Sequence, residues 1–234
     1  MSTNKGDFYG GTDPRHMPLY NMTEAARYLH LAPATLRSWV AGRSYPRKES
    51  QGYFAPLIER PEADDSRLSF MNLIEAHVLR ALRTQHGVSI RAVRDALDYV
   101  DKNLGEKWLL ASQELRTRGG DLLLDKYVQL INLNRSGQLV MRRLLADHLG
   151  RVEWDLSNIP LRLYPFVTSD LPGGRTIAID PHISFGRPIV VRKGISTAVI
   201  AERIDVGEAV EDLALDYGLE KEEVEAALLY ERSA

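Results

Sequence analysis

The sequence contains no cysteine among its 234 residues. Disulfide bonds and thiolate-bound metal sites are therefore excluded, and this composition fits a reducing, cytoplasmic compartment. The sequence also lacks an apolar run of the roughly 20 residues that a helix needs to cross a bilayer. Residues 1–17 are polar and contain no apolar core of the kind that secretory signals carry, so we expect them to form a flexible tail.

Signatures of catalysis are also missing. The six histidines are scattered, and no zinc-binding H-x-x-x-H, G-x-S-x-G or G-x-x-x-x-G-K-[ST] pattern occurs. A metal-dependent nuclease needs clustered carboxylates, whereas the acids here fall on predicted exposed helix faces. His77 is expected to be a buried, hydrogen-bonded side chain. The sequence therefore predicts a protein that is not an enzyme, with no catalytic residue, no metal and no cofactor.

Charge is distributed unevenly along the chain, although the formal net charge is only -2. An ordinary content of 44% hydrophobic and 26% charged residues excludes a wholly disordered or fibrous protein. Residues 205–234 contain ten acids and only two bases, Lys221 and Arg232. Residues 28–48 contain four bases and no acid. Such asymmetry indicates two partners of different charge.

Two short helices joined by a tight turn are predicted between Thr23 and residue 41. Thr23 is the expected N-cap of the first helix, and Pro33 suits the first turn of the second. In the second helix Leu36, Trp39 and Val40 have helical spacing and are predicted to face inward. The residues predicted to face outward are Thr35, Arg37, Ser38 and Ala41. A generic helical hairpin has the same periodicity, but these outward residues favour a helix that enters the DNA major groove.

The next segments extend this pattern. Residues 53–70 are predicted to form a hairpin, or wing, around a polar tip that contains proline, aspartate and serine. A helix capped by Ser69 follows, and a second helix capped by Ser89 comes after Gly87. The second of these helices carries its apolar residues at helical spacing, from Ile90 to Val100.

Residues 19–100 resemble the winged-helix DNA-binding domain of the MerR type. The motifs that carry this resemblance are "MTEAARYLHLAPATLRSW" and "HGVSIRAVRDAL". The resemblance implies that the second helix reads the major groove and that the wing contacts phosphates. It assigns DNA contacts to Thr35, Arg37, Ser38, Arg43, Arg47, Lys48 and Arg67. The long dimerising coiled coil and the effector-binding cysteines of MerR activators are missing, so metal sensing is not expected.

The middle of the chain, residues 105–175, contains no motif with a specific chemistry. We expect a hairpin from Leu122 to Leu133, a helix within residues 137–154 and a strand within residues 161–166. Packing or dimerisation is the favoured role of this region, and a small-molecule pocket is the alternative.

The last segment is predicted to contain two strands, Ile177–Asp180 and Pro188–Arg192, followed by three helices. Ser196 or Thr197 should cap the first helix, whose inward residues would be Val199, Ile200 and Ile204. The outer side of the last helix carries a row of acids, namely Glu220, Glu222, Glu223 and Glu225. This acidic row would repel phosphates, so it is either a solvated surface or a docking surface for a basic protein partner.

Residues 176–230 resemble a small antitoxin-associated domain of otherwise unknown function, through motifs such as "GRPIVV", "IAERIDVG" and "VEDLALDYGL". Together with the first domain, the chain is similar to VapB-type antitoxins of the helix-turn-helix subgroup. That resemblance implies a PIN-like ribonuclease toxin as partner and repression of the shared operon.

The expected fold class is mainly α with short β-hairpins, an α+β protein. The expected domains are a tail at 1–17, a winged helix-turn-helix at 18–104, a middle region at 105–175 and a C-terminal domain at 176–234. The expected function is that of a homodimeric, operator-binding antitoxin that represses transcription. The alternatives are a stand-alone MerR-like regulator that senses a small molecule through residues 105–175, and a DNA scaffold protein.

Overall fold

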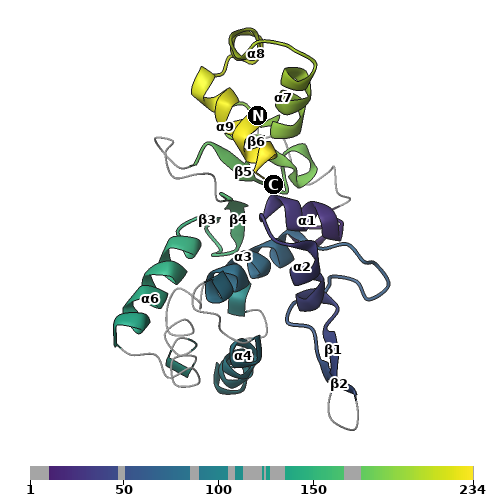
Figure 1. Ribbon diagram of the computed structural model, residues 1–234, viewed down its shortest axis with the longest axis vertical. Helices are drawn as coiled ribbons and strands as arrows, with labels where there is room; N and C mark the ends of the chain where they lie inside the picture. Colours follow the sequence, from purple (N-terminus) through teal and green to yellow (C-terminus); the bar gives the residue numbers. More distant parts are fainter. Residues whose placement is uncertain are drawn as a thin grey trace. The chain divides into compact units, whose positions relative to one another are not determined.

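The computed structural model describes residues 11–46, 51–84, 90–104, 109–112, 123, 125–126, 135–165 and 175–233 (Figure 1). The chain folds into two compact units that interleave along the sequence. The terminal unit contains residues 1–33, 60–70 and 161–234, and the central unit contains residues 34–59 and 71–160. The sequence analysis expected consecutive domains instead, and those boundaries stay a prediction.

The central unit is built around α3 (Phe70–Thr84), whose residues from Phe70 to Leu79 are all buried. The other elements of this unit are α2 (Pro33–Val40), β1 (Arg43–Pro46), β2 (Gln51–Phe54), α4 (Ile90–Leu104), a 3-10 turn (Leu109–Ala111), α6 (Arg135–Leu149) and β3 (Val152–Trp154). Helix α2 buries Leu36, Trp39 and Val40, which confirms the predicted inner face. Its outer residue Arg37 is exposed.

The hairpin of this unit lies earlier in the sequence than predicted. Strands β1 and β2 are antiparallel, and Tyr45 lies opposite Gly52. Residues 55–67 form no strand, so the wing predicted over residues 53–70 was wrong in position. The segment contains Pro56 and Pro61, which cannot donate to a strand ladder. Residues Arg43–Pro46 instead supply the first strand, although their strand signal is weak.

The middle region differs from its prediction in a similar way. Leu123, Asp125 and Lys126 are helical, which contradicts the hairpin expected from Leu122 to Leu133. The rest of that expected hairpin lies outside the described residues. The predicted helix is confirmed as α6, and β4 (Pro160–Leu163) confirms the predicted strand.

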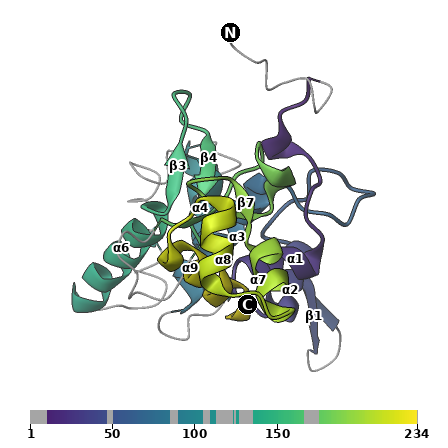
Figure 2. The same ribbon diagram turned by 90° about the horizontal axis from the view of Figure 1, so that it is seen from above.

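The terminal unit combines a small sheet with three helices. Strands β4, β5 (Ile177–Ile179), β6 (Pro188–Val190) and β7 (Ile195–Ser196) follow one another in antiparallel order. Helices α7 (Thr197–Asp205), α8 (Val210–Tyr217) and α9 (Lys221–Arg232) pack together (Figure 2). Helix α9 also contacts β5 and β6. Two 3-10 turns, Pro14–His16 and Ser184–Gly186, belong to the same unit.

The core of these three helices is centred on α9. Ile177, Val190, Ile200, Leu213 and Tyr230 belong to one buried cluster, which joins the sheet to the helices. Gly218 ends α8 with a left-handed backbone at φ 61°, as a glycine stop predicts.

Helix α1 (Met22–Tyr28) also belongs to the terminal unit. Its N-cap is Asn21 rather than the predicted Thr23. The Asn21 Oδ1 atom accepts a hydrogen bond from the Glu24 amide at 2.9 Å, and Glu24 accepts one from the Asn21 amide at 3.1 Å. Such a reciprocal capping box satisfies two amides, which a cap at Thr23 would leave unpaired.

Helices α1 and α9 contact one another inside this unit. The Tyr230 hydroxyl donates a hydrogen bond to the Tyr28 carbonyl at 3.0 Å, and the His30 and Tyr230 rings meet edge to face with centroids 5.2 Å apart. Of the α7 residues predicted to face inward, Ile200 is buried and Ile204 packs against the core, but Val199 is 42% exposed. Thr197 is also buried.

The structure confirms the expected α+β class, in which helices dominate and the strands form short hairpins. Among the described residues, no helix is both long and apolar enough to span a membrane.

Candidate nucleic-acid interface

A concave surface of about 470 Å³ lies beside α2 in the central unit. Three segments form it: α2 with the β1–β2 hairpin, the C-terminal end of α3 and the N-terminal end of α4. We call this surface the basic groove. Its lining residues are Ala34, Thr35, Arg37, Ser38, Trp39, Gly42, Arg43, Phe54, Arg83, Ile90 and Arg94.

The lining of the basic groove carries charge of one sign. It contains four arginines and no carboxylate. Within the described part of the chain, Arg37, Arg43 and Arg83 form no ion pair. Unpaired guanidinium groups that line a concave surface create a positive potential, and phosphate groups are the polyanions that such a surface attracts.

Four of the residues predicted to contact DNA meet in this groove: Thr35, Arg37, Ser38 and Arg43. The Ser38 hydroxyl donates to the Thr35 carbonyl at 2.8 Å, so its oxygen remains able to accept a bond. Arg67 lies in the terminal unit, where its guanidinium pairs with Asp65 at 2.7 Å. The predicted contacts Arg47 and Lys48 lie outside the described residues.

Arg83 and Arg94 were missed by the sequence analysis. Each lies on an amphipathic helix, at a position where an arginine usually marks only the solvated surface. Their approach to α2 depends on contacts between segments far apart in the sequence. The four basic residues between residues 28 and 48 indicated a DNA-binding surface in the sequence, whereas nothing in the sequence connected Arg83 and Arg94 with it.

Glu75 is buried beneath a second concave surface of the central unit, with a volume of about 320 Å³. The side chain is 4% exposed and accepts a hydrogen bond from Asn72 Nδ2 at 2.8 Å. Burial raises the pKa of this carboxyl to about 8, because a charged carboxylate loses its hydration there. Glu59, Asp98 and Asp101 line the same surface.

His77 and His148 form a buried pair of titratable side chains in the central unit. His77 Nε2 lies 3.0 Å from the His148 carbonyl, and the two rings have centroids 5.0 Å apart. This arrangement confirms that His77 is a hydrogen-bonded core residue. Burial lowers the pKa of His77 to about 3 and that of His148 to about 4, so both rings are neutral at pH 7.

The acidic row of α9 is partly neutralised within the terminal unit. Arg192 lies 2.7 Å from Glu220 and 3.3 Å from Glu223, and the latter carboxylate also accepts the Glu220 amide. Glu222 and Glu225 are exposed and form no ion pair within the described residues. The acidic row therefore divides into a structural pair and an available pair.

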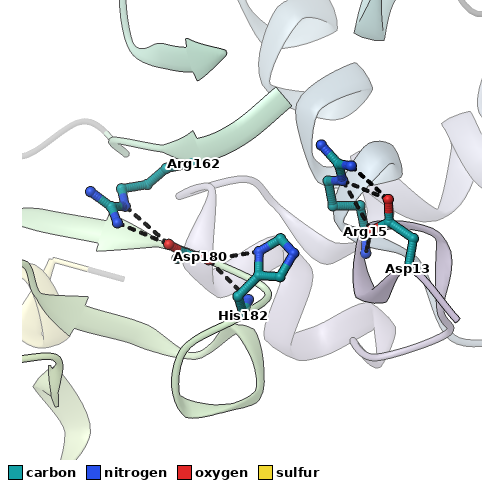
Figure 3. Close-up of polar contacts among 5 residues, drawn as sticks. All are labelled: Asp13, Arg15, Arg162, Asp180 and His182. Carbon is teal, nitrogen blue, oxygen red and sulfur yellow. Dashed lines mark hydrogen bonds and ion pairs between the residues drawn. The ribbon is translucent and has the colours of Figure 1, made fainter. Parts of the chain in front are cut away.

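A further polar cluster lies around Asp180 after β5 (Figure 3). One carboxylate oxygen accepts from Arg162 at 2.9 Å, and the other accepts the His182 amide at 2.9 Å and lies 3.2 Å from His182 Nδ1. The Asp180 side chain is only 4% exposed. Because it caps the turn after β5 and anchors a guanidinium from β4, this cluster holds strand ends together.

Comparison with protein families matches two parts of the chain. Residues 18–97 match a family described as "Putative DNA-binding HTH domain", and residues 177–230 match a family described as "Protein of unknown function (DUF433)". The first match includes every residue that lines the basic groove. The two matches confirm the expected helix-turn-helix and the expected C-terminal domain.

Relatives are similar over nearly the whole chain. One, named "Putative antitoxin VapB45" in Mycobacterium tuberculosis, is 29% identical over 91% of this chain and 93% of its own length. Another, named "Uncharacterized protein Rv2308" in the same organism, is 24% identical over 91% and 89%, respectively. The crystal structure of Rv2018 from that organism matches with a TM-score of 0.66 and 26% identity, over 91% of this chain and 98% of that one. The resemblance to VapB-type antitoxins with a helix-turn-helix is thereby confirmed.

Proposed function

We propose that this chain is an antitoxin that binds operator DNA through the basic groove and represses its own operon. The observation that carries this proposal is the convergence of four arginines, without a carboxylate, around the outer face of α2. The family match at residues 18–97 and the similarity to an antitoxin support it.

In the proposed complex α2 enters the major groove. Its small and hydroxyl-bearing outer residues let the helix approach the bases, while Arg37 reaches base edges or phosphates. Arg43 and Arg83 lie beside α2 and neutralise the adjacent backbone. A homodimer would then present two such helices to an inverted repeat whose half-sites lie about one helical turn apart, or a multiple of that distance.

Substitution of Arg37 tests the DNA half of the proposal. Arg37→Ala should weaken binding to a duplex from the chain's own promoter by about 10- to 100-fold in a gel-shift titration. Arg91→Ala is the matched control, because Arg91 is an exposed arginine of α4 outside the groove lining. Equal affinity of wild type and Arg37→Ala would refute this role of the groove.

The second half of the proposal concerns a toxin. We propose that the terminal unit binds a PIN-like ribonuclease through the available pair of the acidic row, Glu222 and Glu225. Both carboxylates are exposed and form no ion pair within the described residues, so they can meet basic side chains of a partner without breaking an internal bond.

Point substitutions suit this test better than truncation. Removing residues 176–234 would also remove Tyr230, on which Tyr28 of α1 depends for a hydrogen bond. The double variant Glu222→Lys and Glu225→Lys should reduce co-purification with the product of the neighbouring gene, while operator binding is retained. Undiminished co-purification would exclude this surface as the toxin contact.

One observation favours the alternative of a ligand-sensing regulator. Leu109 and Leu110, from the middle region, line the 320 Å³ surface together with Glu75. A small molecule that raises the melting temperature and changes operator affinity would support this alternative. Such an effect should disappear in a Leu110→Arg variant if the molecule binds there.

A further inference from the structure

The β1–β2 hairpin is held by an aromatic stack rather than by strand pairing alone. Tyr45 lies opposite Gly52, and a side chain at Gly52 would place its Cβ atom 2.4 Å from the Tyr45 ring. Glycine therefore leaves the room that the tyrosine ring occupies. The Tyr45 ring stacks on the Phe54 ring, with centroids 4.3 Å apart and planes inclined by 24°.

Arg94 of α4 lies over the Phe54 ring of this stack. Its guanidinium carbon lies 5.6 Å from the centre of the Phe54 ring, and its Nη2 atom donates a hydrogen bond to the Ala55 carbonyl. Its Nη1 atom is buried. Arg94 thus binds the end of β2 both through the ring face and through the backbone. A planar guanidinium can stack on a ring while its N–H groups bond a carbonyl, whereas an ammonium is a compact point charge without a stacking face.

A second contact fixes the base of the hairpin to α2. The Tyr53 hydroxyl donates to the Ala41 carbonyl at 2.6 Å, just beyond the end of the helix. Gly42 has a φ of +75°, and a Cβ atom there would lie 2.3 Å from the Tyr53 hydroxyl. The hairpin is therefore fastened to α2 by Tyr53 and to α4 by Arg94.

We propose that Arg94 is a positioning residue for DNA binding: it fixes the hairpin on α4 so that Arg43 and α2 meet the duplex together. This inference rests on the proposed operator binding. Although Arg94 lines the basic groove, its guanidinium group is engaged by Phe54 and Ala55, whereas Arg37 and Arg43 form no ion pair within the described residues. Arg94 therefore affects operator affinity by fixing the position of the hairpin and not by contacting the DNA itself.

A pair of substitutions at Arg94 separates positioning from direct contact. Arg94→Ala and Arg94→Lys should both weaken operator binding by about tenfold, because alanine removes both contacts and lysine lacks the planar face that stacks on the Phe54 ring. A direct phosphate contact predicts instead that Arg94→Lys binds nearly as well as wild type, since the charge is kept. Arg91→Ala, on the same helix, should bind like wild type. Affinity of Arg94→Lys at the wild-type level would overturn the inference.

A double-mutant cycle with Arg43→Ala gives the sharper test. If Arg94 acts by placing the hairpin, Arg94→Ala should change affinity by less than about twofold in the Arg43→Ala background. Independent, multiplying effects of the two substitutions would overturn the positioning role. Thermal melting of each variant checks whether the chain is folded. If Arg94→Ala unfolds, Phe54→Leu replaces it in the test, because it removes the ring but keeps an apolar side chain. Phe54→Leu should also weaken operator binding.

The outcomes also separate this inference from the function on which it rests. A wild-type chain that fails to bind its promoter duplex would remove the proposed function and the inference together. Wild-type binding that weakens in Arg37→Ala but not in either Arg94 variant would overturn the inference alone.

Discussion

Helices α2 and α9 are each the second helix of a helical pair, and their exposed sides carry charge of opposite sign. Around α2, the guanidinium groups of Arg37, Arg43 and Arg83 form no ion pair within the described residues. On α9, by contrast, Glu220 and Glu223 are paired with Arg192. The two helices thus differ in the sign of their exposed charge and in how much of it is paired within the described residues: none of these three arginines, but two of the four acids of the acidic row.

This difference indicates what each surface can do. An exposed charge that is paired inside its own unit adds little to stability, but a partner must break that pair before it can bind the charge. An unpaired charge can bind an oppositely charged partner without the free-energy cost of breaking an internal ion pair. Its long-range field also increases the association rate. A helix-turn-helix backbone alone therefore does not identify a DNA-binding helix. The sign of the exposed side-chain charges, and whether they are already paired, must be known as well.

The largest expected effect comes from breaking a buried pair of the terminal unit. Asp180→Ala should lower the free energy of unfolding by about 3–5 kcal/mol, because it leaves the Arg162 guanidinium without its buried carboxylate partner. Urea unfolding followed by circular dichroism measures the loss. Asp65→Ala, which breaks the more exposed pair with Arg67, should cost less. Equal losses in both variants would contradict the distinction between buried and exposed pairs.

Glu75 allows a test of buried charge in the central unit. Its folded pKa of about 8 lies above the ordinary value of 4.5, so the folded chain holds a proton that the unfolded chain releases. Stability from this group is complete below pH 4.5 and declines as the pH rises to about 8. Glu75→Gln should therefore stabilise the fold at pH 7 by up to about 3 kcal/mol. A wild-type unfolding free energy that is as flat as that of the variant from pH 5 to 8 would argue against a buried, protonated carboxyl.

Reversing the charge of Arg37 tests whether operator binding depends on the positive charge around α2. Arg37→Glu should weaken operator binding by about 100-fold, because a carboxylate in the basic groove repels phosphate as well as losing a contact. The melting temperature should hardly change, since Arg37 is exposed. The converse variant, Glu225→Lys, should leave operator affinity within about twofold. A loss of affinity of similar size in both variants would show that only overall charge matters.

The smallest expected effect concerns the two buried histidines. Their folded pKa values of about 3 and 4 lie below the ordinary 6.5, so the unfolded chain binds protons that the folded chain excludes. Stability from these rings is present above pH 6.5 and is lost as the pH falls toward 3. His77 alone should account for about 2 kcal/mol of this loss at pH 5. His77→Gln should flatten the acid limb of a plot of unfolding free energy against pH, and an unchanged limb would mean that His77 is not the group that titrates.

The parts of the fold that the sequence predicted correctly rest on local periodicity. Leu36, Trp39 and Val40 share one face of a short helix, and that spacing alone indicates burial. The hairpin was placed wrongly because β1 and β2 are only four residues long each, and the Tyr45–Phe54 stack that holds them depends on Gly52 and on Arg94 of a later helix. No window of the sequence displays that dependence.

The candidate sites follow the same division. Thr35, Arg37, Ser38 and Arg43 could be chosen from the sequence because they lie within one short basic segment. Arg83 and Arg94 join them only after α3 and α4 have packed. Likewise, the acidic row appeared uniform in the sequence, whereas Arg192, 28 residues before Glu220, pairs with two of its four members. Long-range contacts decide which charges stay available.

The salt dependence of operator binding tests the central claim most directly. Association constants for wild type and Arg37→Ala are measured on the promoter duplex over a range of salt concentrations and plotted as logarithms. We expect a steep negative slope for wild type and, for Arg37→Ala, weaker binding with a slope shallower by about one, because one phosphate contact is lost. Two superimposed lines, or wild-type binding that does not depend on salt, would contradict the claim that unpaired arginines around α2 hold the DNA.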